Sequence, residues 1–135
     1  MMNRVPTILV IEDEPEIARL IGSILESDGM HVISTDQSEP ALAAARATAC
    51  HAIILDLVLP GRSGLGILAE LKAHPTLRRV PVIVVSALAA SFPPTWRGDV
   101  VEVIAKPFDA DHLIAVVRRA VESSLPPDPH PATQP

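Results

Sequence analysis

The hydrophobic residues of the chain fall into five short runs, which predict five buried strands. Thr7 to Ile11, Ala52 to Leu55 and Pro81 to Val85 are rich in β-branched and apolar residues without polar alternation. Such runs are typical of strands that are covered on both faces, as in a parallel sheet. His31 to Ser34 and Val100 to Ala105 complete the set. The pattern therefore predicts a sheet that is buried on both sides.

Between these runs the hydrophobic period lengthens to that of amphipathic helices. From Pro15, which is acceptable in a first turn, apolar residues recur at i, i+3, i+4 and i+7 until Gly29, a typical helix stop. Ser38, Ser63 and Asp109 are placed to cap three further helices. The last of these helices is expected to bury Leu113, Val116, Val117, Ala120 and Val121.

Strands that alternate with helices predict an α/β fold, with a doubly wound five-stranded parallel sheet, right-handed crossovers and helices on both faces. The fourth helix should be short or irregular, because Pro93-Pro94 cannot lie in a helix interior. A chain of 135 residues is long enough for one domain, which we expect over residues 1–125. Residues 126–135 are proline-rich, and we expect them to form a disordered tail.

Composition and charge narrow the class of protein. The chain is 48% hydrophobic and 20% charged, as in a soluble globular protein, and its net charge is -5. No basic cluster exceeds Arg78-Arg79 or Arg118-Arg119, so we expect no nucleic-acid partner. The single cysteine, Cys50, cannot form an internal disulfide. Neither a signal peptide nor a membrane span is predicted, so we expect a cytoplasmic protein outside the membrane.

Polar residues stand where the predicted strands end. Glu12 and Asp13 follow the first strand, Asp56 the third, Ser86 the fourth and Lys106 the fifth. In open parallel sheets the ligand site lies outside the carboxyl ends of the strands. The five residues are therefore predicted to converge on one edge of the sheet.

This set of residue types points to a particular chemistry. Three carboxylates repel one another unless a cation lies among them, and a small number of hard oxygen ligands suits Mg²⁺. An aspartate carboxylate is also a nucleophile that can attack phosphorus and form an acyl phosphate. The ammonium of Lys106 and the hydroxyl of Ser86 would then help to neutralise the phosphoryl oxygens. We therefore predict a magnesium-dependent phosphoryl site at Asp56.

Four motifs carry a resemblance to a known family. Glu12-Asp13, Asp56 to Gly61, Ser86-Ala87 and Lys106 to Phe108, in this order and spacing, resemble the receiver domain of two-component response regulators. The similarity covers about residues 6 to 122, and we expect a stand-alone, CheY-like receiver. The fold that this resemblance implies is flavodoxin-like, with strand order 2-1-3-4-5.

The resemblance also implies roles for the acidic residues. Asp56 matches the phosphoacceptor of the family, and Glu12 and Asp13 match its metal-binding acidic pair, with Asp13 as a direct ligand. The backbone carbonyl of Val58 matches a further metal ligand, two residues after the acceptor. The implied cofactor is Mg²⁺, held by Glu12, Asp13, Asp56 and the Val58 carbonyl.

Two more residues take roles from the resemblance. Ser86 matches the hydroxyl that follows the phosphoryl group, and Lys106 matches the lysine that pairs with it. The Lys106-Pro107 peptide is expected to be cis, as in the family. The implied donor is a sensor histidine kinase or a histidine phosphotransfer protein. The implied product is a phosphoprotein. No output domain is expected after Leu125, so we expect the effect to pass through an unknown downstream protein, through a homodimer, or through removal of phosphate from a shared kinase.

The chain departs from the family pattern at two places. Val103 stands where the family usually has an aromatic residue that turns inward on activation. The segment around Pro93-Pro94 replaces an ordinary fourth helix, and it contains Trp96, which is either an anchor for a partner or a packed residue. The output surface is therefore expected to differ from that of other receivers.

Three function classes stay open at this point. We favour a phosphoacceptor regulatory module, which is no enzyme beyond self-catalysed phosphotransfer and dephosphorylation. The alternative is a pseudo-receiver that acts as a constitutive protein-interaction module. The missing aromatic at Val103 keeps this class open, whereas the intact acidic pair, Asp56, Ser86 and Lys106 count against it. A magnesium-dependent phosphohydrolase needs a second acid shortly after the nucleophile, and Leu57 to Leu59 offers none.

Overall fold

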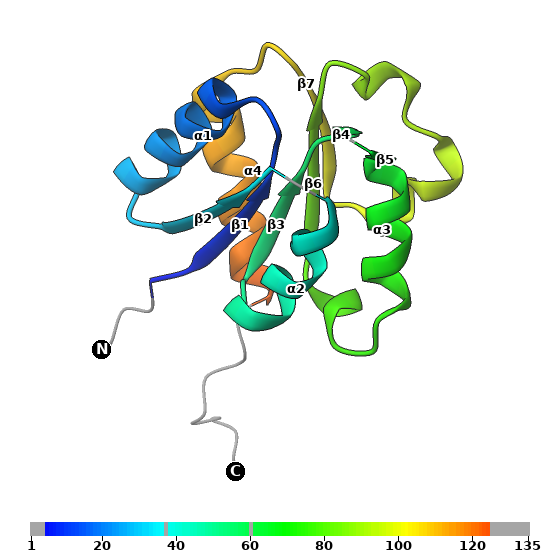
Figure 1. Cartoon of the computed structure of the whole chain (residues 1–135). Helices are drawn as coiled ribbons and strands as arrows, with labels where there is room; N and C mark the ends of the chain where they lie inside the picture. Colours follow the sequence, from blue (N-terminus) through cyan, green and yellow to red (C-terminus); the bar gives the residue numbers. More distant parts are fainter. Residues whose placement is uncertain (1–4, 37, 60, 125–135) are drawn as a thin grey trace.

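The computed structural model describes residues 5–36, 38–59 and 61–124, and within them a five-stranded parallel sheet crosses the molecule (Figure 1). The spatial order is β2-β1-β3-β6-β7, which is the predicted order 2-1-3-4-5 when only these strands are counted. The predicted fold class is therefore confirmed. The strands are β1 (Thr7–Ile11), β2 (His31–Thr35), β3 (Ala52–Leu55), β6 (Val82–Ser86) and β7 (Glu102–Ala105).

Two layers of helices cover the sheet and divide the core into two clusters. Alternate residues of a strand point to opposite faces, so Leu9 and Ile53 enter one cluster and Ile8 and Ile54 the other. The first cluster contains residues of α2 and α3, and the second contains residues of α1 and α4. The helices are α1 (Pro15–Ser27), α2 (Ser38–Thr48), α3 (Gly64–Ala73) and α4 (Ala110–Ser124).

The ends of the helices follow the predicted signals. Gly29, just past α1, has a φ of 89°, a value that favours glycine. The Ser63 hydroxyl accepts a hydrogen bond from the Leu65 N–H at 3.0 Å, and the Asp109 carboxylate accepts one from the His112 N–H at 2.9 Å. Both predicted caps are therefore confirmed. α2 begins at Ser38, whose side chain lies outside the described part of the chain. The five apolar residues predicted to be buried in α4 are all buried.

The connection between β3 and α3 contains a small element that the sequence pattern did not predict. β4 (Val58–Leu59) and β5 (Arg62–Ser63) form an antiparallel pair, with Val58 opposite Ser63. The hydrophobic pattern indicated only a turn at this point. Gly61 has a φ of 80°, which lets the backbone reverse within a very short hairpin.

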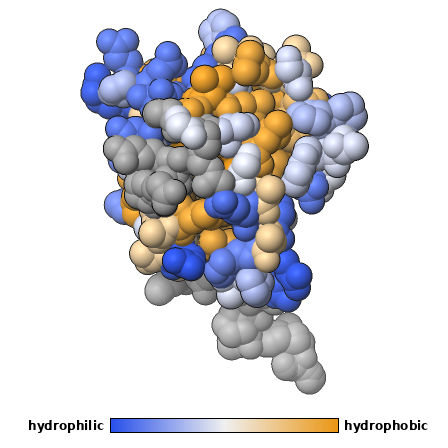
Figure 2. All heavy atoms as spheres, turned by 45° about the vertical axis from the view of Figure 1, so that its right-hand side comes forward, coloured by the Kyte–Doolittle hydropathy of each residue, from blue (hydrophilic) through white to orange (hydrophobic). Residues whose placement is uncertain are grey.

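The fourth crossover, where the paired prolines predict a short or irregular helix, has no α-helix. Two 3₁₀ helices lie there between β6 and β7: η2 (Ala89–Ser91) and η3 (Pro94–Asp99). A further 3₁₀ helix, η1 (Leu77–Arg79), lies earlier, between α3 and β6. Phe92 is buried and Trp96 is partly buried against the same core cluster, so Trp96 packs within its own chain. The last strand starts at Glu102, two residues later than predicted. Figure 2, in which the right-hand side of Figure 1 comes forward, shows hydrophobic residues gathered on the upper part of this face.

The predicted tail, residues 126–135, lies outside the described residues, and so do residues 1–4 and residue 125. Within the described residues, no helix is long and apolar enough to cross a membrane. The domain division at residue 125 therefore stays a prediction.

Candidate functional site

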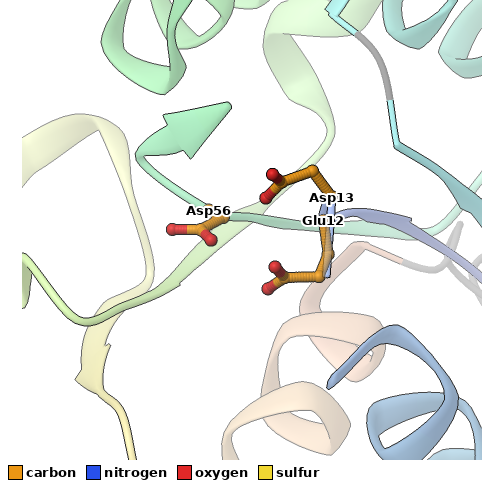
Figure 3. A group of neighbouring side chains, drawn as sticks. All are labelled: Glu12, Asp13 and Asp56. Carbon is orange, nitrogen blue, oxygen red and sulfur yellow. The ribbon is translucent and has the colours of Figure 1, made fainter. Parts of the chain in front are cut away.

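Three carboxylates meet at the carboxyl ends of β1 and β3. One oxygen each from Glu12, Asp13 and Asp56 lies within 4.8 Å of the others, and Figure 3 shows the three side chains pointing into a common space. Glu12 and Asp56 are 2% and 4% exposed. The prediction that Glu12, Asp13 and Asp56 meet at this edge of the sheet is therefore confirmed.

Strand register explains why residues 44 positions apart become neighbours. Ile11 lies opposite Leu55 in the parallel pair β1–β3, so the residue that follows each strand is carried to the same place. The Asp56 N–H donates to the Ile11 carbonyl at 3.0 Å, which continues the ladder into the site. On the other side of β6, the Lys106 N–H donates to the Ser86 carbonyl at 3.1 Å.

The Asp56 carboxylate is held at both oxygens. Oδ1 accepts a hydrogen bond from the Val58 N–H at 3.2 Å, and Oδ2 accepts one from Lys106 Nζ at 3.0 Å. Val58 itself is exposed. The two hydrogen bonds therefore fix the orientation of the carboxylate at the end of β3.

Gly64, the first residue of α3, fixes the peptide that carries Asp56. Its N–H donates to the Leu57 carbonyl at 2.9 Å, and a Cβ at this position would lie 2.2 Å from the Asp56 carbonyl oxygen. The φ of Gly64 is not positive, so close approach alone requires glycine. Sequence reasoning missed this residue. A glycine directly after a helix cap, where better helix formers are available, is the signal that could have found it.

Lys106 is the cation of the site. Its Nζ lies 2.8 Å from Glu12 Oε1, 3.0 Å from Asp56 Oδ2 and 3.4 Å from Glu14 Oε1. Burial disfavours the charged form of Lys106, but the hydrogen bonds to Glu12 and Asp56 outweigh it, and the pKa of the lysine is raised. Lys106 is therefore charged at neutral pH and stabilises the carboxylates around it.

Glu12 shows the opposite balance. Burial raises the pKa of its carboxyl above the usual value, and the hydrogen bond from Lys106 compensates only in part. Nearby Asp56 adds to the rise through charge repulsion. Burial first, and the Asp56 charge second, therefore disfavour the charged form of Glu12, which a further cation beside it would stabilise.

The donor set fits a divalent metal ion. Carboxylate oxygens within 4.8 Å of one another are the hard ligands that Mg²⁺ takes in small number, with water and phosphate oxygens completing its shell. Lys106 supplies one positive charge, whereas its three carboxylate partners carry three negative charges when ionised. The net negative charge of the site therefore favours binding of a second cation. Glu12, Asp13 and Asp56 are the residues that can hold it.

Ser86 lies at the same edge, as the last residue of β6, and is fully buried. Its hydroxyl accepts a hydrogen bond from the Leu88 N–H at 3.1 Å. The partner of the hydroxyl among the described residues is therefore the backbone that leads into η2, and not one of the carboxylates.

The two remaining predictions concern Val103 and Pro107. Val103 is partly buried and packs against the core cluster that includes Phe92. The Lys106–Pro107 peptide is cis, as the resemblance implies.

Comparison with known proteins gives the family. A family model described as the response regulator receiver domain matches residues 8–118. The chain belongs to this family of regulatory domains in two-component systems, and the predicted membership is confirmed.

Curated relatives are longer proteins. KdpE, a transcriptional regulatory protein of Mycobacterium tuberculosis, is 37% identical over 116 residues, which cover 84% of this chain and 50% of KdpE. The nitrogen assimilation regulatory protein NtrX of Azorhizobium caulinodans is 34% identical over 122 residues, which cover 86% of this chain and 26% of NtrX. The chain thus spans about half or less of the length of these relatives.

Solved structures show the same architecture. A sensor protein from Polaromonas sp. JS666 matches with a TM-score of 0.84 and 29% identity, covering 89% of this chain and 98% of that one. NtrX from Brucella abortus matches with a TM-score of 0.75 and 35% identity, covering 90% and 28%. A CheY-like receiver domain from Methylobacillus flagellatus has a TM-score of 0.79 at 23% identity, which supports the fold alone.

Proposed function

We propose that the chain is a phosphoacceptor module of a two-component phosphorelay, with Asp56 as the acceptor and Mg²⁺ as the cofactor. The observation that carries the proposal is the joint placement of Asp56 beside Lys106 and two further carboxylates at the end of the sheet. The donor in this proposal is a sensor histidine kinase or a histidine phosphotransfer protein, and an unidentified downstream protein reads the result. The receiver domain would occupy residues 1–125 and the tail 126–135, which agrees with the family match over 8–118.

The proposed step is an in-line displacement at phosphorus. An oxygen of the Asp56 carboxylate forms the new O–P bond, while the P–N bond of the donor phosphohistidine breaks and the imidazole nitrogen keeps the electron pair. A bound Mg²⁺ would neutralise charge on the phosphoryl oxygens. Lys106, already 3.0 Å from Asp56 Oδ2, needs only a small movement to pair with the same oxygens. Ser86 would turn its hydroxyl toward them.

Phosphate uptake by the intact chain tests this function. In Mg²⁺ with acetyl phosphate, we expect a base-labile adduct of about 80 Da, because acyl phosphates form at carboxylate nucleophiles. Chelation of Mg²⁺ by EDTA should prevent its formation, and electrospray mass spectrometry measures it directly. A chain that takes up no phosphate from acetyl phosphate or from histidine kinases would contradict the proposal and leave the pseudo-receiver. Rapid turnover of a phosphomonoester would favour a phosphohydrolase instead.

Trp96 is expected to report the phosphorylated state. If the Ser86 hydroxyl turns to the phosphoryl group, the Leu88 N–H loses its acceptor, and the segment from 87 to 99 can rearrange. Because Trp96 is the one tryptophan and lies in η3 against the core, its fluorescence emission should change on phosphorylation. Amide exchange of Leu88 should become faster. Unchanged emission together with unchanged exchange, at full phosphorylation, would rule out this route.

A further inference from the structure

Glu14 is a fourth carboxylate at the site. It is neither the proposed phosphoacceptor nor one of the proposed ligands of Mg²⁺. It occupies the residue before α1, with φ −87° and ψ 111°, and its side chain makes no capping hydrogen bond. A carboxylate at this position usually accepts from the free N–H groups of the first turn. That of Glu14 instead lies 3.4 Å from Lys106 Nζ, 92 residues away in the chain. The sequence did not single it out, although it follows the acidic pair directly.

The backbone of Glu14 is held by the site itself. Its N–H donates to Glu12 Oε2 at 3.1 Å, while the other oxygen of the same carboxylate contacts Lys106 at 2.8 Å. The Glu14 carbonyl accepts the first hydrogen bond of α1, from the Ala18 N–H at 3.0 Å. One carboxylate therefore sets the position of both Glu14 and Lys106, and the contact between them is built into the site.

The two sides of Lys106 differ in access to water. Glu12 and Asp56 are almost fully buried, whereas the Glu14 side chain is 62% exposed. Lys106 thus has two inner carboxylate partners and one outer partner at the mouth of the site. An incoming phosphoryl donor is anionic, so it meets the Glu14 charge first, and its oxygens need the ammonium that Glu14 shares.

We propose that Glu14 is a positioning residue, which holds the Lys106 ammonium toward the mouth of the site and thereby restrains phosphorylation of Asp56. This inference rests on the proposed function. Without Glu14, Lys106 pairs with Glu12 and Asp56 alone. Its ammonium can then pair with the phosphoryl oxygens without competition from Glu14. The same shift puts the ammonium in competition with Mg²⁺ for those two carboxylates. Loss of Glu14 therefore speeds phosphorylation at saturating Mg²⁺ and weakens binding of Mg²⁺.

Three variants separate the effect of the Glu14–Lys106 ion pair from the effect of the negative charge itself. Glu14→Gln removes the ion pair and the charge. Glu14→Asp keeps the charge, but its shorter side chain withdraws the carboxylate from Lys106. Glu16→Gln, in the first turn of α1 and exposed, removes an equal charge without touching the lysine. The measurements are the rate of phosphorylation by acetyl phosphate, at low and high salt, and the affinity for Mg²⁺ alone by calorimetry. Because exposed ion pairs contribute little, the expected changes are roughly two- to fivefold.

We expect Glu14→Gln and Glu14→Asp to be phosphorylated faster and to bind Mg²⁺ more weakly than the wild type, while Glu16→Gln matches the wild type. The rate difference should shrink in high salt. The inference is overturned if Glu14→Asp behaves as the wild type, or if Glu16→Gln changes as much as Glu14→Gln. If the wild type takes up no phosphate, the proposed function fails, and the Mg²⁺ affinities alone still decide whether Glu14 positions Lys106.

Discussion

Replacement of Asp56 by asparagine is expected to abolish phosphate uptake and to leave a folded chain. The amide cannot form the acyl phosphate, and loss of a nucleophile typically lowers a rate by at least about a hundredfold. An asparagine keeps the shape of the side chain, can still accept from the Val58 N–H and relieves repulsion with Glu12. Lys106 keeps its contact of 2.8 Å with Glu12, so no buried charge is left without a partner.

The same substitution should weaken binding of Mg²⁺. Even residues that only support a metal ligand change metal affinity by about 10- to 100-fold, and Asp56 is one of three carboxylates that can be ligands. Intact-mass spectrometry and calorimetry measure the two effects, and circular dichroism checks the fold. Asp111→Asn, an exposed residue of α4 with the same change of charge, is the matched control. Undiminished uptake by Asp56→Asn would place the acceptor at another residue.

Replacement of Gly64 by alanine is expected to displace the backbone that carries Asp56. The new Cβ would lie 2.2 Å from the Asp56 carbonyl oxygen and 2.7 Å from the Leu57 Cα, and both are backbone atoms that cannot rotate away. The start of α3 and the acceptor peptide must therefore separate. Overpacking of this kind costs about 1–3 kcal/mol of the free energy of unfolding, or more. The hydrogen bond from the Gly64 N–H to the Leu57 carbonyl would weaken as well.

The larger effect of Gly64→Ala should be on phosphorylation. A displacement of the nucleophile by about 1 Å can lower a rate roughly 100-fold, so uptake should fall by more than the loss of folded protein explains. Urea unfolding gives the stability and mass spectrometry the rate. In Gly98→Ala the added Cβ meets nothing within 4 Å, and in Gly22→Ala it meets only a Val32 methyl at 3.8 Å, so both should keep the wild-type rate. A Gly64→Ala chain with the stability and rate of the wild type would contradict this account.

Much of the fold follows from local patterns that need no tertiary information. The five apolar runs, the caps at Ser63 and Asp109, and the stop at Gly29 are each decided by a few neighbouring residues. The irregular fourth crossover follows equally from Pro93-Pro94, because proline lacks the N–H that a helix interior needs. The hairpin of β4 and β5 escaped prediction, since each strand is only two residues long and carries no measurable period.

Position at strand ends made the site predictable as well. A parallel sheet brings all carboxyl ends to one edge, so Glu12, Asp13, Asp56 and Lys106 had to meet once the strands were assigned. Glu14 and Gly64 were missed for a physical reason. The role of Glu14 depends on a side chain that contacts Lys106 and makes no capping hydrogen bond to α1, and that of Gly64 depends on the distance between two backbones. Neither the contact nor the distance produces a pattern among neighbouring residues of the sequence.

The sequence by itself determined the α/β class, the strand order through the resemblance, and the residues that gather at the edge of the sheet. These features depend on periodicity and on chain order, which can be read without coordinates. Only the tertiary structure decided which partners each side chain has. It gives Lys106 three carboxylate partners, joins the Ser86 hydroxyl to the Leu88 N–H, and packs Trp96 against the core. Contacts between distant residues such as these exist only once the sheet is assembled.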